Sequence, residues 1–352
     1  MPRILSARSA YPPHRYRQAE LARGLVEMVE GGHAKIDAER IQRLFSAVKV
    51  DTRYLALPLE QYRLLTGFEA RNRAWLEGAL PLGEAAIVGA LQDAGLHASD
   101  VQLLASSTVT GLAVPSLEAR LMNRLPFASD CRRLPLFGLG CVAGAAGVAR
   151  LSDYLQGHPT HAALLLCVEL CSLTFQPEDT SPANVVACAL FGDGAACVVM
   201  VGDEHPLASR APLRVEATRS VLFPQTERVM GWDIVDEGFR VVLDGKVPEL
   251  ARTALASSLR SFLAAHGLSP PQVRRWLAHP GGPAVIDAME AGLELPPGTL
   301  DRSRACLARI GNMSSASVLA ILEESLKSDD PAGAGVLLAM GPGFCAELVL
   351  LR

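Results

Sequence analysis

The chain has 352 residues and a mass of 37.4 kDa, and its 33 lysines and arginines against 37 aspartates and glutamates give a formal net charge of −4. This balance excludes nucleic-acid binding by overall charge, and 49% hydrophobic with 20% charged residues excludes an intrinsically disordered chain. A chain of this length usually folds as about two domains or two halves.

The first half alternates helices with strands that are apolar throughout. The predicted elements are a strand before Tyr16, helices over Gln18–Glu30, Arg40–Val48 and Gly83–Gly95, a strand over Val101–Ser106, a helix over Ser116–Leu125, a strand over Leu134–Leu139, a helix over Cys141–Gln156, and strands over Ala162–Val168 and Phe191–Val201. Apolar strands that alternate with helices predict a sheet buried on both faces.

The loop-rich stretch Gly202–Pro212 predicts a boundary, which divides the chain into residues 1–205 and 206–352. The second half repeats the pattern, with predicted helices over Ala251–His266, Ala284–Leu293 and Ser315–Leu326 and strands over Trp276–His279, Gly335–Met340 and Glu347–Leu351. Two halves of this kind predict a pseudo-duplicated α/β fold.

The eight cysteines lie mostly inside apolar runs and lack the spacing of a disulfide scaffold or a zinc site. No secretory leader is recognised, and the apolar stretches are shorter than the roughly 20 residues of a membrane-spanning helix. We therefore expect a cytoplasmic protein without a transmembrane segment. His158 and His161 lie in a proline-containing loop without thiols or carboxylates nearby, so no metal site is predicted.

Cys141 is a candidate nucleophile. It begins the helix that follows the predicted strand, after a turn that Gly138 and Gly140 permit. A thiol at a helix N-terminus faces the positive end of the helix dipole, which favours the thiolate. The alternative is a small cysteine buried in a close-packed helix.

Two further residues could act with such a thiol. His279 ends an apolar strand and precedes Pro280–Pro283, which directs it into a crevice at the sheet edge. Asn312 lies beside a helix start that serines cap. The alternatives are a structural histidine and an ordinary turn residue.

Five motifs lie in order along almost the whole chain: Phe137–Cys141, Phe191–Ala196, His279–Pro283, Gly311–Ser315 and Gly341–Phe344. Together they resemble the type III polyketide synthases, the chalcone synthase-like branch of the thiolase superfamily. Within this family the chain looks most similar to the bacterial alkylpyrone synthases, through Val50–Leu59, Val168–Thr174 and Met340–Leu351.

The resemblance implies an α/β, thiolase-like fold whose two halves form a five-layered α-β-α-β-α arrangement, and a homodimer. It implies acyl-CoA and malonyl-CoA as substrates, with no cofactor and no metal. Cys141 would hold the growing chain as a thioester, and His279 and Asn312 would stabilise the enolate formed when malonyl-CoA loses CO₂.

The resemblance also assigns a gatekeeper and a pocket. Phe191 would separate the CoA tunnel from the reaction cavity. The implied pocket residues are Thr110, Cys171, Thr174, Trp232, Val241, Ser314, Gly341, Pro342, Gly343 and Phe344. The implied CoA contacts are Arg40, Arg43 and Ala284.

Three pocket positions differ from plant chalcone synthases. Cys171 stands in place of a threonine, Trp232 in place of a glycine and Val241 in place of a phenylalanine. These exchanges favour a long aliphatic starter, extended by malonyl-CoA or methylmalonyl-CoA and closed to an alkyl-α-pyrone. An alkylresorcinol product and a β-ketoacyl-carrier-protein synthase III-like activity remain alternatives, as does a thiolase with Cys345 as second cysteine.

Overall fold

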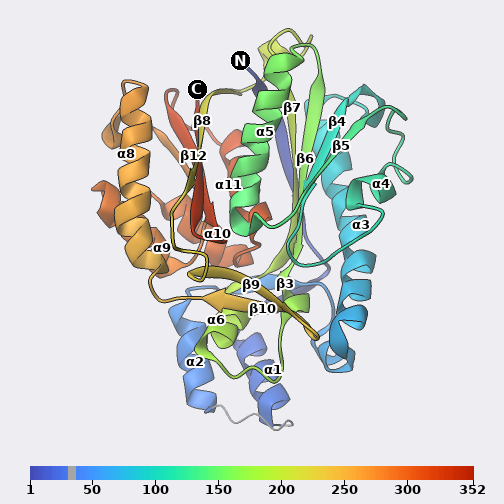
Figure 1. The fold of residues 1–352 in the computed structure, drawn as a ribbon, viewed down its shortest axis with the longest axis vertical. Coiled ribbons are helices and arrows are strands. Elements are labelled where there is room, and N and C mark those ends of the chain that lie inside the picture. Colours follow the sequence, from blue (N-terminus) through green and yellow to red (C-terminus); the bar gives the residue numbers. More distant parts are fainter. Residues whose placement is uncertain (31–36) are drawn as a thin grey trace.

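The structure is a computed structural model that describes residues 1–30 and 37–352 (Figure 1). Its described residues form a central mixed sheet of nine strands. In spatial order the strands are β11 (Arg275–Ala278), β12 (Gly335–Gly341), β13 (Cys345–Leu351), β8 (Leu213–Leu222), β1 (Arg3–Ala10), β7 (Asp193–Val201), β6 (Ala162–Leu170), β4 (Leu103–Ser107) and β5 (Arg132–Leu136). The pairs β11–β12, β4–β5 and β4–β6 are parallel, and the other pairs are antiparallel.

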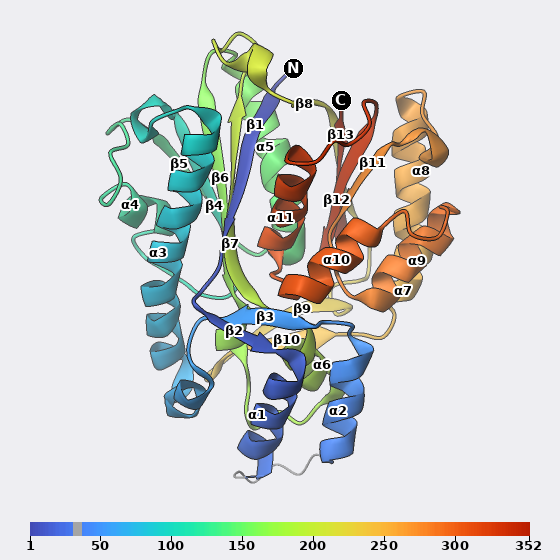
Figure 2. The ribbon, with the colours of Figure 1, turned by 180° about the vertical axis from the view of Figure 1, so that it is seen from behind.

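The sheet consists of two halves that are weakly joined. β1 and β8 pair through two residue pairs, Arg3 with Arg214 and Ile4 with Leu213. Helices α5 (Ala143–Gly157) and α11 (Ser315–Leu326) lie between the halves (Figures 1 and 2). The outer faces are covered by α3 (Gly67–Ala94) on one side and by α8 (Ala256–Ala265) and α9 (Pro283–Leu293) on the other. This layering confirms the predicted α-β-α-β-α arrangement.

The strand β6 shows why both faces of the sheet are buried. Its alternate residues Leu164, Leu166 and Val168 belong to the core on the α3 side, whereas Ala163 and Leu165 belong to the core on the α5 side. Side chains alternate between the two faces of a strand, so an apolar residue at every position buries both.

Small residues let α5 approach its neighbours closely. A Cβ atom added at Gly147 would lie 2.4 Å from a methyl group of Leu165, and one at Gly144 would lie 2.4 Å from the carbonyl oxygen of Ser315. The alanine- and glycine-rich sequence of α5 therefore sets the distance between Cys141 and the start of α11.

The helix α3 differs from its prediction, because it begins at Gly67 and contains Pro81, whereas the sequence predicted a start at Gly83. Burial of Trp75 and Ala79 stabilises the turns before the proline. By length and composition α3 could span a membrane. It packs against β1, β6 and β7 instead, and 44% of its most apolar stretch of 18 residues is buried. It is a core helix here.

Several elements form a smaller layer at the end of the sheet where the site lies (Figures 1 and 2). They are α1 (Gln18–Glu30), α2 (Ala38–Ala47), α6 (Pro182–Leu190), and the strand pairs β2 (His14–Arg17) with β3 (Thr52–Leu55) and β9 (Met230–Val235) with β10 (Gly238–Leu243). The remaining helices are α4 (Leu117–Leu121), α7 (Val247–Leu250) and α10 (Asp301–Ile310), and a π-helical turn over Ala251–Leu255 precedes α8.

Candidate active site

Cys141 lies where the sequence predicted, at the N-terminal end of α5. It occupies a short 3₁₀ turn, Gly140–Val142, after Gly138 and Gly140 have adopted positive φ angles of 86° and 54°. A Cβ atom at Gly140 would lie 2.6 Å from the ring of Pro342. Only glycine fits this turn at low cost, so the turn brings Cys141 beside the loop that follows β12.

Asn312 and Ser314 lie beside Cys141. The Cys141 thiol donates to Ser314 Oγ at 3.4 Å, and the Ser314 amide donates to Asn312 Oδ1 at 2.8 Å. Asn312 also pairs through its backbone with the segment around Phe191, since its amide donates to the Leu190 carbonyl and its carbonyl accepts from the Gly192 amide, each at 2.9 Å. Among the described residues, Asn312 Nδ2 has no hydrogen-bond partner, so it remains available as a donor.

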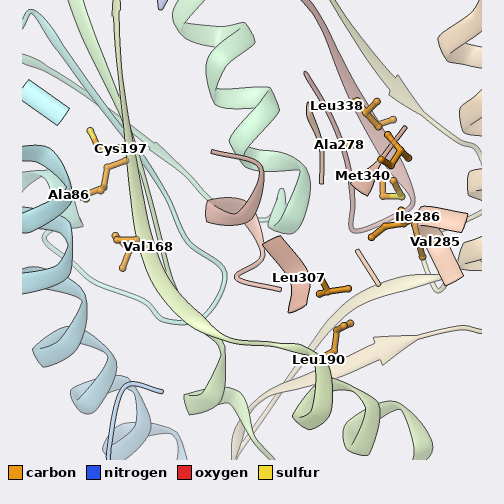
Figure 3. Packing of buried hydrophobic residues seen from close by; sticks show 14 of the residues in the cluster. Ala86, Val168, Leu190, Cys197, Ala278, Val285, Ile286, Leu307, Leu338 and Met340 are labelled. Carbon is orange, nitrogen blue, oxygen red and sulfur yellow. The ribbon is translucent and has the colours of Figure 1, made fainter. Parts of the chain in front are cut away.

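His279 follows β11, as predicted, and is 1% exposed. Its amide donates to the Leu338 carbonyl at 2.8 Å. Its Nδ1 is buried without a partner in the described part of the chain. The loop after it lies against α6, since a Cβ atom at Gly282 would be 3.9 Å from the Leu190 side chain. Figure 3 shows Leu190 and the neighbouring core around Ala278 and Ile286.

Burial leaves the thiol and the imidazole neutral. It raises the pKa of Cys141 to about 12, although the hydrogen bond to Ser314 lowers it, and it lowers the pKa of His279 to about 3. The thiolate predicted from the helix N-terminus is therefore not the resting form, because burial outweighs the helix dipole. Activation of Cys141 needs a proton acceptor, but no hydrogen bond joins Cys141 to His279 among the described residues, and the lowered pKa of His279 makes its imidazole a weak base in this buried state.

Glu169 is a buried acid that sequence reasoning missed. It is the penultimate residue of the apolar strand β6, where a lone acidic residue was the available signal. Its carboxylate accepts from Ser315 Oγ at 2.6 Å, from Thr110 Oγ1 at 3.1 Å and from the Val109 amide at 3.2 Å. Thr110 thus supports Glu169 and lies in this hydrogen-bond network, next to the start of α11.

Glu169 makes stability depend on pH. Burial raises its pKa from 4.5 to about 7, against the lowering effect of its hydrogen bonds. The folded state therefore holds this proton more tightly than the unfolded state, so the free energy of unfolding falls as pH rises from about 4.5 to about 7, by up to about 3 kcal/mol. We expect Glu169→Gln to reduce this slope in urea unfolding at graded pH and to leave the part that comes from Asp193, whose pKa burial raises to about 6; an unchanged slope would assign it to other groups.

Two cavities meet at Trp232. The α1–α2 cavity, of about 80 Å³, contains Phe191 and the predicted pocket residues Cys171, Thr174, Trp232 and Val241 in its wall, together with side chains of α1 and α2. The hairpin cavity, of about 220 Å³, is lined by Val109, Phe137, Gly138, Trp232, Pro342, Gly343 and parts of β9 and β10. The Trp232 ring lines both cavities, and its centroid lies 6.2 Å from that of Phe191, which lines the α1–α2 cavity.

Two of the predicted pocket residues, Gly341 and Phe344, pack against other parts of the protein. A Cβ atom at Gly341 would lie 2.6 Å from the Leu139 carbonyl oxygen, so Gly341 allows β12 to approach the Cys141 turn. Phe344 is fully buried against Phe223, with ring centroids 5.3 Å apart. It packs in the core, and it does not belong to the described residues that line the α1–α2 cavity or the hairpin cavity.

The predicted CoA contacts lie on the surface, and the structure does not bring all of them together. Arg43 lines a shallow pocket on α2 with Lys49, and it lies 3.4 Å from Glu39 and 3.9 Å from Asp37. Arg40 is exposed on the same helix. Ala284 is exposed in the first turn of α9.

Cys345, the second cysteine that a thiolase would use, lies at the start of β13. Cys345 donates to the Pro342 carbonyl at 3.3 Å, and burial raises its pKa to about 11. Within residues 1–30 and 37–352, no three histidine, cysteine, aspartate or glutamate side chains are grouped so that they could hold a metal ion.

Comparison with known proteins places the chain in a family. Residues 2–204 match the model for the N-terminal domain of chalcone and stilbene synthases, and residues 214–352 match that for the C-terminal domain. The 1,3,6,8-tetrahydroxynaphthalene synthase of Streptomyces peucetius subsp. caesius is 51% identical, over 99% of this chain and 92% of that protein.

Solved structures agree. The 1,3,6,8-tetrahydroxynaphthalene synthase of Streptomyces coelicolor A3(2), a bacterial type III polyketide synthase, superposes with a TM-score of 0.92 at 31% identity, over 99% of this chain and 98% of that one. Germicidin synthase from Streptomyces coelicolor superposes with a TM-score of 0.90 at 25% identity, over 99% and 98%. The chain therefore has the thiolase-like fold of these enzymes and belongs to the chalcone and stilbene synthase family, the type III polyketide synthases.

Proposed function

We propose that Cys141 holds the growing polyketide as a thioester. His279 and Asn312 then stabilise negative charge on the thioester oxygen of malonyl-CoA, the extender. The observation that carries this proposal is a pair of hydrogen bonds through Ser314: its Oγ accepts from Cys141, and its amide donates to Asn312 Oδ1. Among the described residues, Asn312 Nδ2 then has no partner and can donate to a substrate. An amide N–H and an imidazole N–H are suitable donors to an oxyanion.

The proposed steps use the chemistry of these three side chains. Cys141 Sγ attacks the starter thioester, and its proton passes to the departing CoA sulfur; the Sγ–acyl bond forms, the bond between the acyl carbon and the CoA sulfur breaks, and CoA leaves as a thiol. Malonyl-CoA loses CO₂, and the electron pair forms an enolate whose oxygen accepts from His279 and Asn312. The enolate carbon then attacks the Cys141 thioester, which releases the Cys141 thiolate and a β-ketoacyl-CoA for the next round.

For the product, we propose a chain built from malonyl units and closed to an aromatic ring. The support is 51% identity, along almost the full length, to an enzyme named 1,3,6,8-tetrahydroxynaphthalene synthase. The hydroxyl groups of that named product stand on alternate carbons, the pattern that condensed malonyl units leave. Type III polyketide synthases are acyltransferases that use CoA thioesters and need no further cofactor.

A second candidate is a fatty acyl-CoA starter and an alkyl-α-pyrone or alkylresorcinol product. The α1–α2 cavity favours it, because Leu21, Leu25 and Met28 give part of its wall an aliphatic surface. An adjoining cavity of about 860 Å³ shares Met28, Tyr62 and Phe175 with it, which leaves room for a longer chain. Family membership decides against the carrier-protein synthase and thiolase alternatives.

One product assay separates the candidates. The purified protein is incubated with malonyl-CoA alone, and with acyl-CoAs of graded length plus malonyl-CoA or methylmalonyl-CoA, and the products are identified by mass. An aromatic product from malonyl-CoA alone supports the first candidate. Pyrones or resorcinols that form only when a fatty acyl-CoA is present support the second, and Cys141→Ala protein provides the control.

Replacing Cys171 by phenylalanine tests the cavity as an acyl site. Cys171 is 4% exposed in the cavity wall, so a bulky ring there fills space that a starter would occupy. We expect Cys171→Phe to reduce product from dodecanoyl-CoA at least about tenfold more than product from acetyl-CoA, measured as initial rates. Equal losses for both starters would contradict an acyl site at Cys171, and Cys171→Thr is the matched control.

We also propose that the protein is a cytoplasmic homodimer and that each polypeptide is divided into two halves, residues 1–205 and 206–352. Dimer formation is supported by the exposed apolar side chains of Leu112, Val114 and Phe137. The division is supported by the short β1–β8 pairing. The free thiols among the described cysteines suit a reducing compartment.

A further inference from the structure

Arg53 is a buried cation in the wall of the α1–α2 cavity. It lies on β3 and is 3% exposed. Its Nη1 donates to the Phe191 carbonyl at 2.5 Å, and its guanidinium lies over the Phe45 ring, 5.7 Å from the centroid. Phe45 and Phe191 line the same cavity, so Arg53 is held between two aromatic residues of the cavity wall.

The guanidinium has donors to spare. Among the hydrogen bonds of the described residues, the one to Phe191 is the only bond of the Arg53 side chain, and Nε is buried without a partner. A guanidinium carries several N–H donors in a fixed plane and stays charged at neutral pH. Burial lowers the pKa of Arg53 to about 10, so it remains a cation at neutral pH.

Asp193, whose charge acts on Arg53, does not satisfy this cation directly. Asp193 accepts from the Ala56 amide at 2.6 Å, from the Ser172 amide at 2.8 Å and from Ser172 Oγ. Its oxygens are thus already engaged, and no hydrogen bond joins Asp193 to Arg53 in the described part of the chain.

The other polar side chains of the cavity wall are engaged within the protein. Tyr62 bonds to Ser172 at 2.5 Å, Thr174 donates to the Cys171 carbonyl at 2.7 Å, and Asn184 donates to the Gln176 and Asp179 carbonyls at 2.8 and 2.7 Å. A buried cation with unused donors is costly unless something in the cavity accepts from it.

We propose that Arg53 is a specificity-determining residue, which donates to the ketone oxygens of a growing poly-β-keto chain in the α1–α2 cavity. This inference rests on the proposed function and deepens its first candidate. A chain built from malonyl units carries an oxygen on every second carbon, whereas a fatty acyl chain offers the guanidinium no acceptor. Arg53 therefore favours the oxygenated chain in a cavity whose other side is aliphatic.

Acyl loading on Cys141 tests the inference before any extension takes place. The purified enzyme reacts briefly with octanoyl-CoA, 5-oxooctanoyl-CoA or 7-oxooctanoyl-CoA, each alone, and the adduct is measured by intact-protein mass. We expect the wild-type enzyme to load at least one ketone analogue about tenfold faster than octanoyl-CoA, the size of a charged hydrogen bond. Arg53→Met should lose this preference while loading octanoyl-CoA at the wild-type rate or faster.

Further variants separate specificity from folding. Arg53→Lys keeps a charged donor and should keep part of the preference, while Tyr54→Phe, on the same strand but outside the cavity wall, should keep all of it. If Arg53→Met does not fold, the pair Arg53→Lys and Arg53→Gln makes the same comparison. Thermal unfolding of each variant reports on folding.

The contrary outcomes are distinct. Equal loss of octanoyl and ketone loading in folded Arg53→Met or Arg53→Gln would make Arg53 a purely structural support for Phe191. Wild-type loading without any ketone preference would overturn the assignment of Arg53 and leave the proposed function standing. A wild-type enzyme that forms no adduct with these three starters or with malonyl-CoA would overturn the proposed function and this inference with it.

Discussion

Cys141→Ala protein is expected to form no acyl adduct with any starter CoA. The sulfur at this position is the proposed attacking atom, and its removal takes away the only bond through which the chain can be held during condensation. We expect loading to fall at least about 10³-fold, since the loss of a catalytic nucleophile commonly costs that much or more. The measurement is intact-protein mass after incubation with a starter acyl-CoA.

Cys345→Ala is the matched control for this experiment. Cys345 is the thiol that a thiolase would use as its second cysteine, and it bonds to the loop residue Pro342. Its variant should load at the wild-type rate. A starter adduct on Cys141→Ala protein would move the nucleophile elsewhere, and loss of loading in Cys345→Ala would point to two-cysteine chemistry.

Asn312→Ala is expected to slow malonyl-CoA decarboxylation by roughly 10²–10³-fold, the cost of one lost oxyanion donor. The reason is the unused Nδ2 donor, which the Ser314 amide positions by holding Oδ1 at 2.8 Å. Decarboxylation is followed as release of labelled CO₂ from malonyl-CoA. Loading of a starter on Cys141 should remain within about threefold of wild type, because that step does not need the enolate oxygen to be stabilised.

Asn312→Asp distinguishes a lost donor from lost structure. Aspartate keeps an oxygen that can accept from the Ser314 amide, but it replaces the N–H donor with a negative charge. It should therefore be at least as slow as Asn312→Ala in decarboxylation while unfolding near the wild-type temperature. Unchanged CO₂ release in both variants would place the oxyanion donor elsewhere.

The resting charge state of the site has a consequence for these assays. Burial favours neutral Cys141 and neutral His279, so the thiol must transfer its proton during the reaction. The Glu169 carboxyl, with a pKa near 7, lies one hydrogen bond from Ser315, next to the Ser314 that accepts from Cys141. Loading rates should accordingly be compared at a fixed pH.

Much of the fold could be predicted because its pattern is local. The helices α1 and α11 have the bounds predicted for them, and β6 and β12 lie within one or two residues of theirs. The strands β9 and β10 were missed because they pair with each other over a cavity and alternate weakly, and α10 was missed because its polar face dominates its composition. The start of α3 was misplaced because Pro81 marks a helix end locally, whereas packing of Trp75 keeps the helix intact.

By itself the sequence determined the family and indicated three candidate reactive residues, because the motifs around Cys141, His279 and Asn312 are short and their chemistry belongs to the side chains. The tertiary structure decided which groups surround them. It buried Cys141 and His279 as neutral groups, brought Glu169 beneath the start of α11, and placed Arg53 against Phe191, 138 residues away along the chain. These properties depend on desolvation and on contacts between distant segments, which exist only once the chain has folded.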